Sequence, residues 1–550
     1  MLGLQTSRTL LLLLAALFTA SCASAPERSA TVELHVLALN DFHGNLESPD
    51  GGTRVRDANG VERREIGGGS AARVAALVAE RRAAAPHAIM VAAGDLIGAS
   101  PMLSGLFHDE PTIEAMTMMG LDLSAVGNHE FDEGADELRR MQNGGCHPRD
   151  GCRGPAPFEG AGFHYLAAST IVEATGQTIF PASAIRTFDG VRVGFIGLTL
   201  EGTPDALAPS SSAGLRFLDE VTTINAEAAR LQAEGVQAIV VLLHEGGARE
   251  AAPGDCPGLS GAIVPIVEGL SPAVDVVVSG HTNGIYICRV GSKLLTSAGQ
   301  YGAYLTDITL TLDRASGDVA ASSAQNIIVA HTLPEDAAVA THVNAYSVLA
   351  APLRNRVVGA IAAPLMRTLS NSGESPMGLV VADSMIAGAA AELGQPPHVA
   401  FQNPGGVRAD LATAGPTTYN SLYSVLPFGN DLVVMDMTGA EIETLIQQQF
   451  RGADTTILQI SNGSGFAWRM GANGPELVPG SIRIAGAPLD RTRTYRVVTN
   501  SFLATGRDGF TAFGGDRVRT FVGGDLAALE AYVAAHSPLQ APSAPRVRRQ

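Results

Sequence analysis

The sequence predicts an α/β fold built in two parts. Between about Val32 and Val329, continuous apolar runs alternate with helical stretches, as in sheets whose strands are covered on both faces. A second unit, from about Ile361 to Ala535, mixes helical and strand patterns in another order. The chain of 550 residues is 46% hydrophobic and 17% charged, which indicates a globular protein able to bury sizeable cores.

Six apolar runs in the first part end in polar residues. They are VELHVLAL before NDFHG, HAIMVAA before GDLIGAS, LDLSAV before GNHEFD, VRVGFIGL before TLEGT, AIVVLL before HEGG and VDVVVS before GHTN. In open α/β sheets, ligands bind beyond the carboxyl ends of the strands. We therefore expect these six segments to converge on one site.

A long helical stretch at 333–358 connects the two parts. It begins with Pro334, Glu335 and Asp336, which favour the first turn of a helix. These patterns divide the chain into a domain at 32–330, a helical linker or hinge at 331–360, a smaller α/β domain at 361–536 and a disordered tail at 537–550.

Residues 1–25 have the pattern of a signal peptide, because Arg8 precedes an apolar run that is too short for a good membrane span. The segment Thr19-Ala20-Ser21-Cys22 is similar to a bacterial lipobox, in which Cys22 carries a lipid anchor. Ordinary cleavage after Ala23-Ser24-Ala25 is the alternative. Both interpretations place the mature protein outside the cytoplasm, in the periplasm or at the surface of a bacterium.

The formal net charge is −17, and the body of the chain has no Lys/Arg-rich run. A protein that binds a nucleic-acid polymer needs a basic surface, so no such partner is expected. Small phosphates remain compatible with an acidic protein if metal ions and a few arginines are placed locally.

Four cysteines remain when Cys22 is set aside, and an even number suits an oxidising compartment. Four cysteines allow three pairings. Cys146 and Cys152 flank a short loop, so we pair them, which leaves Cys256 with Cys288. A zinc site built from these cysteines is disfavoured because no CxxC spacing occurs.

The polar segments contain seven side chains that suit divalent metal ions: Asp41, His43, Asp95, Asn128, His244, His281 and Asn283. Carboxylates, imidazoles and amides together form a ligand set for two divalent metal ions such as zinc, manganese or cobalt. Asp41 and His43 can face one ion, and the two oxygens of Asp95 can bridge two. Each residue alone suits an ordinary turn or a structural role, but the ordered combination favours a metal centre.

The segment GNHEFD, at 127–132, has two interpretations. In one it is a turn followed by a helix start, with Asn128 as the capping residue. In the other, Asn128 binds a metal ion and His129 faces a substrate. Glu130 has no catalytic role in either and is expected on the solvent side.

The set NDFHG, GD, GNHEFD and GHTN resembles the motifs of the calcineurin-like metallophosphoesterases, and more narrowly those of the 5′-nucleotidase/UDP-sugar hydrolase family. The resemblance implies a four-layer αββα domain followed by a smaller substrate-binding domain. It also implies that one metal ion is held by Asp41, His43, Asp95 and Asn283, and the other by Asp95, Asn128, His244 and His281. It further implies a catalytic dyad, in which His129 stabilises charge or protonates the leaving group and Asp132 keeps it charged.

The second domain has three glycine-rich segments, NPGGVR, PFGN and FLATGRDGF. A nucleotide needs aromatic rings for its base, a carboxylate for its ribose and arginines for its phosphate. The resemblance makes Phe428 and Phe502 the base sandwich, Asn403 and Asp508 the contacts to nucleoside and ribose, and Arg408 the phosphate ligand. Arg367 is the second candidate arginine, because Gly373 stands where the family's motif often has one.

These patterns predict an extracytoplasmic, metal-dependent 5′-nucleotidase whose two domains close over a nucleotide. UDP-sugars and 2′,3′-cyclic nucleotides are further candidate substrates. The alternatives are a related hydrolase of a non-nucleotide phosphoester or sulfur compound, and a surface lipoprotein that binds nucleosides without hydrolysis.

Overall fold

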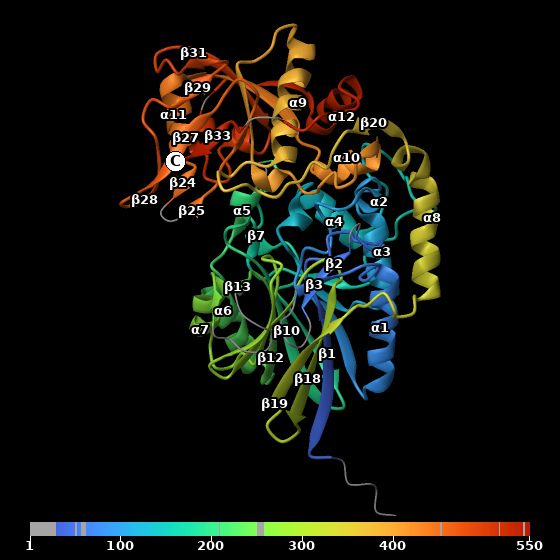
Figure 1. The fold of residues 1–550 in the computed structure, drawn as a ribbon. Helices are drawn as coiled ribbons and strands as arrows, with labels where there is room; N and C mark the ends of the chain where they lie inside the picture. The colour runs from blue at the N-terminus through green and yellow to red at the C-terminus, as the bar shows by residue number, and fades with distance from the viewer. Residues whose placement is uncertain are drawn as a thin grey trace, which may run out of the picture.

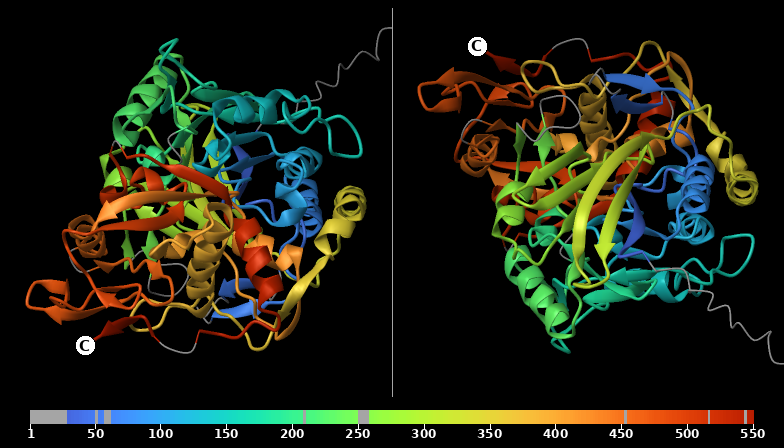
Figure 2. Two further views of the ribbon diagram at one scale, coloured as in Figure 1. Left: turned by 90° about the horizontal axis from the view of Figure 1, so that it is seen from above. Right: turned by 90° about the horizontal axis from the view of Figure 1, so that it is seen from below.

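The computed structural model describes residues 29–49, 52–56, 62–207, 210–249, 258–451, 454–515, 517–542 and 545–550. The leader predicted at 1–25, with Cys22, lies outside these residues, as does Cys256. Figure 1 shows a first domain, blue to yellow-green, with one end covered by a second domain in orange and red. Figure 2 shows the same arrangement from above and below.

Two six-stranded sheets form the centre of the first domain. One has the order β19 (Val319–Ile328), β18 (Tyr304–Asp313), β1 (Thr31–Leu39), β4 (Ala88–Ala92), β5 (Leu123–Ala125) and β6 (His164–Leu166). The other has the order β16 (Ile285–Val290), β17 (Lys293–Ala298), β15 (Val276–Ser279), β12 (Ala238–His244), β10 (Val191–Thr199) and β9 (Ser183–Phe188). Strands β1, β4, β5 and β6 are parallel, as are β10, β12, β15 and β17, so several carboxyl ends meet at one edge of each sheet.

The sheets pack face to face, and helices cover their outer faces. Leu34 and Val36 of β1 point into the core between the sheets, whereas Leu37 and Leu39 join the core beneath α1 (Ala71–Ala84) and α3 (Glu110–Met118). Helices α6 (Glu220–Ala233) and α7 (Ile263–Gly269) cover the second sheet. Because each central strand is covered on both faces, its sequence is continuously apolar. The predicted four-layer αββα domain is confirmed.

The shorter elements of the first domain are β2 (Thr53–Arg56), β3 (Glu62–Glu65), α2 (Met102–Gly105), η1 (His129–Phe131), α4 (Ala135–Asn143), β7 (Thr170–Val172), β8 (Gln177–Thr178), α5 (Thr203–Ala206), β11 (Leu215–Phe217), β13 (Ala248–Arg249) and β14 (Leu259–Ser260). Helices α2, α3 and α4 lie at the end of the domain that faces the second domain (Figure 1).

Helix α8 (Ala337–Arg354) lies within the predicted linker and packs against the first domain. The Asp336 carboxylate caps it by accepting hydrogen bonds from the backbone N–H groups of residues 338 and 339. The hydroxyl of Tyr346, a buried residue of this helix, donates to the Glu114 carboxylate at 2.8 Å. The chain leaves this helix for the second domain only after Arg354, through β20 (Val357–Ile361).

A five-stranded sheet forms the centre of the second domain, in the order β26 (Gln459–Ile460), β21 (Val399–Gln402), β31 (Thr494–Asn500), β23 (Asp431–Thr438) and β32 (Thr520–Gly524). Helices α9 (Pro376–Leu393) and α12 (Asp525–Ala535) pack on one face, and α11 (Gly439–Gln447) packs on the other. Among the described residues, α9 is the one helix long and apolar enough to cross a membrane. It contributes Met377, Val381 and Met385 to the core, which fits a core helix of a globular domain.

The remaining elements of the second domain are η2 (Pro404–Gly406), β22 (Gly415–Thr418), α10 (Tyr419–Val425), β24 (Phe450–Arg451), β25 (Asp454–Thr455), β27 (Phe466–Gly471), β28 (Gly474–Leu477), β29 (Arg483–Ile484), β30 (Ala487–Pro488), η3 (Leu503–Thr505), η4 (Thr511–Phe513) and β33 (Val547–Arg549).

The C-terminal residues correct one prediction. Residues 537–550 were expected to be disordered, but β33 pairs in parallel with β27. The Arg546 guanidinium binds both oxygens of the Asp383 carboxylate, at 2.8 and 2.7 Å, and its backbone N–H donates to Glu374. The local sequence is rich in proline and arginine, and its order comes from partners at least 80 residues away.

Arg546→Ala is expected to lower the free energy of unfolding by about 3 kcal/mol, because the mostly buried Asp383 carboxylate loses its partner. Arg548→Ala, on the same strand but exposed, is the matched control and should change it by less than ~0.5 kcal/mol. Denaturant unfolding of both variants checks this, and equal midpoints would contradict the docking of the C-terminal strand.

Candidate metal centre

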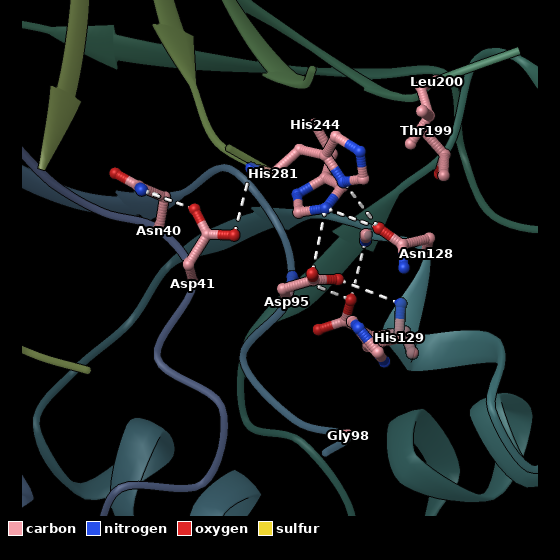
Figure 3. Close-up of polar contacts among 12 residues, drawn as sticks. Asn40, Asp41, Asp95, Gly98, Asn128, His129, Thr199, Leu200, His244 and His281 are labelled. Atoms are coloured by element: carbon pink, nitrogen blue, oxygen red, sulfur yellow. Dashed lines mark hydrogen bonds and ion pairs between the residues drawn. The ribbon is translucent and has the colours of Figure 1, made fainter. Parts of the chain in front are cut away.

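Six of the seven predicted metal ligands come together at one edge of the two packed sheets, and Figure 3 labels five of them, Asp41, Asp95, Asn128, His244 and His281. Asp41 and His43 follow β1, Asp95 follows β4 and Asn128 follows β5, all in the first sheet. His244 ends β12 and His281 follows β15, both in the second sheet. The two sheets are also joined here by the Thr199 hydroxyl, which donates to the Val126 carbonyl at 2.6 Å.

The loops that carry these ligands are strained. Five non-glycine residues of the set, Asp41, His43, Asp95, His281 and Asn283, have left-handed backbone with φ between 48° and 69°. Each costs about 1–2 kcal/mol relative to an ordinary conformation. Gly94, just before Asp95, has no room for a side chain, because a Cβ would lie 2.6 Å from the Gly127 nitrogen. The surrounding cores therefore hold the loops in conformations that their sequence disfavours.

Asp95 is the central residue of the cluster. Its Oδ2 lies 3.6 Å from His43 Nε2 and 3.1 Å from His244 Nε2. Two groups of potential ligands share it, one with His43 and His129 and the other with His244 and His281. The Asn128 amide oxygen lies 3.0 Å from His244 Nε2 and 2.9 Å from His281 Nδ1, so it belongs to the second group.

Hydrogen bonds on the far side of the rings orient the histidines. His43 donates from Nδ1 to the Gly98 carbonyl at 2.9 Å, and His244 donates from Nδ1 to the Ala93 carbonyl at 2.7 Å. Both Nε2 atoms then face Asp95. Histidines that ligate metal ions are held in this way, because the outer hydrogen bond fixes the tautomer and the ring orientation.

The electrostatics of the buried carboxylates favour cations. Asp41 and Asp95 are both almost completely buried. Burial, together with repulsion by Asp95, raises the pKa of Asp41 to about 7, although His244 opposes this. Burial also disfavours the charge on Asp95, but attraction by His244 and His129 lowers its pKa well below the usual range. Buried carboxylates beside imidazole nitrogens form a donor set that suits divalent metal ions, so the residues fit the predicted metal centre.

His129 and Asp132 form a hydrogen-bonded pair beside this cluster. His129 Nδ1–H donates to Asp132 Oδ2 at 2.8 Å, and the backbone N–H of His129 donates to Asp95 Oδ1 at 2.9 Å. Burial opposes the charged ring, but Asp132 and then Asp95 raise the pKa of His129 to about 9. The ring is therefore charged at neutral pH, with its Nε2–H directed away from Asp132.

Glu130 lies in the interior, which corrects the expectation of a solvent-facing position. Its carboxylate accepts hydrogen bonds from the backbone N–H groups of Asp95, Leu96 and Gly127, at 2.9, 2.8 and 2.7 Å. Burial and repulsion by Asp95 raise the pKa of Glu130 to about 8. Glu130 thus holds together the two loops that carry Asp95 and Asn128. The sequence GNHEFD does not indicate this role, because an acidic residue near a helix start is usually exposed.

Residues of the second domain lie beside the His129–Asp132 pair. The Phe428 ring stacks on the His129 ring, with centroids 6.0 Å apart, and the Arg408 guanidinium lies 5.7 Å from the Phe428 centroid. Arg408 is close enough to oppose the positive charge of both His43 and His129. A pocket between the domains is lined by His129, Asp132 and Phe428, together with Tyr423 and Pro427 of the second domain.

Other predicted substrate residues form a second group. The Asn403 amide donates to Asp508 Oδ2 at 2.9 Å, and burial raises the pKa of Asp508. Arg367 donates to the Arg408 carbonyl at 2.6 Å, so it supports the loop that carries Arg408. Phe502 packs at the edge of the core of the second domain. The enclosure of a base by Phe428 and Phe502 stays a prediction.

Asn283 is exposed, and none of the contacts among the described residues joins its side chain to the cluster. Its role as a ligand stays a prediction. Asn40 is a supporting residue for which the sequence offered no role: its amide donates to Asp41 Oδ2 at 2.6 Å and to the Gly299 carbonyl at 2.7 Å. In the sequence, the one indication of this role is that Asn40 directly precedes Asp41 in NDFHG.

The cysteine predictions have different outcomes. Cys146 and Cys152 form a disulfide, with a Cα–Cα distance of 4.6 Å. Cys288 is buried on β16, and its predicted partner, Cys256, lies outside the described residues.

Comparison with known proteins identifies the family. The sequence model of the 5′-nucleotidase C-terminal domain matches residues 357–515. This segment is a 5′-nucleotidase C-terminal domain. A solved structure of this family, the 5′-nucleotidase precursor from Thermus thermophilus, is 25% identical, with a TM-score of 0.72 over 94% of this chain and 99% of that one.

Two longer relatives also match this chain. Endonuclease YhcR of Bacillus subtilis is 31% identical over 86% of this chain and 37% of its own length. Cell wall protein Lmo0130 of Listeria monocytogenes is 31% identical over 91% of this chain and 66% of its own length. The chain thus spans less than two thirds of each of these relatives.

Glu130→Gln is expected to weaken the binding of divalent metal ions by ~10–100-fold, because an amide NH₂ would face backbone N–H groups and release the Asp95 loop. Calorimetric titration of chelator-treated protein with Zn²⁺ or Mn²⁺ checks this. Asp136→Asn, at a fully exposed position on α4, is the control. An unchanged dissociation constant for Glu130→Gln would show that Glu130 does not support the centre.

Proposed function

We propose that this protein is an extracytoplasmic, metal-dependent 5′-nucleotidase that hydrolyses nucleoside 5′-monophosphates to nucleoside and phosphate. One observation carries the proposal. Asp95 is shared by two groups of potential metal ligands, and beside them Phe428 of the second domain stacks on His129, with the Arg408 guanidinium 5.7 Å from the Phe428 centroid. Such a site brings together ligands for metal ions, phosphate and an aromatic base.

In this proposal Asp41, His43, Asp95 and Asn283 hold one divalent ion, and Asp95, Asn128, His244 and His281 hold the other. Two such ions, when bound, activate a water molecule and neutralise the phosphoryl oxygens. The chain's own part is to hold the carboxylates and the histidine Nε2 atoms facing one another. The carbonyls of Gly98 and Ala93 and the amide of Asn40 support this.

His129 acts on the phosphoryl group from the other side. Because Asp132 accepts the Nδ1–H bond, the Nε2–H of the charged ring is available to a phosphoryl oxygen or to the leaving oxygen. Arg408 binds the phosphate with its planar guanidinium, and Arg367 holds the Arg408 loop in place. The negative charge that develops in the reaction is thus met by two cationic side chains.

The second domain selects the nucleoside. Phe428 and Phe502 enclose the base, and Asp508 and Asn403 bind the ribose and nucleoside. The Asn403–Asp508 hydrogen bond supports this assignment because it holds both polar groups side by side before a ligand arrives. Aromatic stacking tolerates every base, so it does not restrict the substrate to one nucleotide. UDP-sugars and 2′,3′-cyclic nucleotides are further substrates to be tested. Nucleic-acid polymers are not expected.

The location outside the cytoplasm is supported by the signal-peptide pattern and by the Cys146–Cys152 disulfide, since disulfides persist in oxidising compartments. A relative is named a cell wall protein. We place the protein in the periplasm or at the bacterial surface, with a lipid anchor at Cys22. Because α8 is fixed to the first domain, the hinge for domain closure would lie at 355–360, after that helix.

Phosphate release from AMP is expected to require a divalent metal ion and to stop on treatment with a chelator. His129→Asn should lower kcat by ~10²–10³ while the metal content is unchanged, because the ring stabilises developing charge. Phosphate assays and elemental analysis of the same samples check both parts. A protein that binds nucleosides but releases no phosphate with Zn²⁺, Mn²⁺ or Co²⁺ would favour the non-catalytic alternative.

Phe428→Ala is expected to raise the KM for AMP by about 5–150-fold, since stacking on one aromatic ring contributes ~1–3 kcal/mol per base. The KM for p-nitrophenyl phosphate, which has no nucleoside, should change much less. Equal effects on the two substrates would indicate that Phe428 acts through His129 and does not bind the base.

A further inference from the structure

One contact between the two domains is made by a tyrosine that rests on a glycine. Tyr423 lies on α10 of the second domain, and Gly105 is the last residue of α2 in the first domain. The two helices meet at the boundary between the domains (Figure 1). A Cβ added to Gly105 would lie 2.2 Å from the Tyr423 hydroxyl oxygen and 3.3 Å from the ring carbon that carries it. The hydroxyl therefore occupies the space that any other residue at position 105 would need for its side chain.

The backbone of Gly105 does not require a glycine. The residue is helical and is not among those with positive φ. Apart from Tyr423, the nearest atom to the added Cβ outside the helix is the Ser100 carbonyl oxygen at 3.7 Å, an ordinary contact distance. Glycine is the least favourable residue in a helix after proline. The missing side chain at position 105 is thus explained by the contact with Tyr423.

On the side of the second domain, α10 holds two residues of the candidate substrate site. The carbonyl of Val425, its last residue, accepts a hydrogen bond from the backbone N–H of Arg408 at 2.9 Å. Phe428 follows the helix after two residues and stacks on His129. A shift of α10 against α2 would therefore move Arg408 and Phe428 together, relative to the first domain.

On the side of the first domain, α2 begins four residues after Gly98, which contacts the candidate catalytic residues. The Gly98 carbonyl accepts a hydrogen bond from His43 Nδ1 at 2.9 Å. A Cβ added to Gly98 would lie 2.6 Å from the Cβ of His129 and 2.8 Å from Asp132 Oδ2, so this loop packs directly on the His129–Asp132 pair. The contact between α2 and α10 thus joins a segment fixed to the pair with a helix fixed to the substrate residues.

Two other contacts between the domains are less suited to hold this arrangement. Arg507 Nη1 lies 3.5 Å from Asp205 Oδ1, but the Asp205 side chain is 93% exposed, and exposed ion pairs contribute little. The stack of Phe428 on His129 involves residues that must also meet a substrate in the proposed function. The contact of the tyrosine with the glycine has neither limitation, because it is half-buried and uses no residue assigned to the substrate.

We propose that the Tyr423–Gly105 contact sets how α10 docks on α2, and that Tyr423 is thereby a positioning residue for Arg408 and Phe428. This role rests on the proposed function, in which those two residues bind phosphate and base. The hydroxyl does not touch the substrate; it fixes the distance between the substrate residues and the first domain. A misplacement of about 1 Å can cost ~10²-fold in rate, so such a contact affects catalysis from outside the reacting centre.

The kinetic test combines Gly105→Ala with Tyr423→Phe. Gly105→Ala places a methyl group 2.2 Å from the hydroxyl oxygen. It is expected to lower kcat/KM by about tenfold or more for both AMP and p-nitrophenyl phosphate, because Arg408 moves with α10. In the Tyr423→Phe background the nearest ring carbon is 3.3 Å away, and Gly105→Ala should change kcat/KM by less than about threefold. Equal effects of Gly105→Ala in the two backgrounds would overturn the proposal.

Hydrogen exchange measures the docking without activity. Gly105→Ala is expected to speed the exchange of backbone amides in α10 by about fivefold or more, with no change in the core strand β12. In the Tyr423→Phe background it should have no such effect. If the contact did not set the docking, alanine would leave this exchange unchanged or slow it, since it is the better helix former, and that result would overturn the proposal.

Gly202→Ala is the matched control for the exchange measurement. Gly202 also has right-handed helical backbone, and the nearest atom to an added Cβ is 3.7 Å away, so the exchange of α10 should not change. A protein that shows the expected exchange pattern but releases no phosphate would contradict the proposed nucleotidase activity and would still support the docking contact.

Discussion

The structure depends on one electrostatic constraint: the carboxylates of Asp41 and Asp95 are buried together at the junction of two sheets, beside histidines that are oriented toward them. Two buried negative charges are costly unless cations balance them. Five left-handed residues in the same loops add a backbone cost of about 1–2 kcal/mol each. The apolar cores between and outside the sheets offset these costs, so the fold holds the metal ligands in place before any ion arrives.

Support for this arrangement comes from groups that never touch a metal ion. Glu130 accepts three backbone N–H groups and joins the Asp95 and Asn128 loops, and Asn40 holds Asp41 against the neighbouring strand. The carbonyls of Gly98 and Ala93 fix two histidine tautomers. Outer partners of this kind set the orientation and basicity of the ligands, so the chemistry of the centre is distributed over many more residues than the ligands themselves.

In the proposed function, recognition and chemistry are divided between the two domains. The first domain provides the candidate metal ligands and the His129–Asp132 pair, and the second brings Arg408 and Phe428 against His129. Helix α8 packs against the first domain, so the hinge that we propose lies in the few residues after it. In the proposed function, the pocket that meets the leaving group is thus built on a separate unit from the metal ligands.

The sequence by itself determined the four-layer domain, the position of the candidate metal ligands after strand ends and the Cys146–Cys152 disulfide. Strand periodicity and the order of the motifs are local properties, and local patterns can be read along a chain. Only the tertiary structure decided that Glu130 is buried, that Arg546 anchors the C-terminal strand to Asp383, that Phe428 lies on His129 and that Tyr423 meets Gly105. The physical reason is the same in each case: burial and pairing depend on partners distant in the sequence, and no local pattern encodes the loop or domain that will cover a charged side chain.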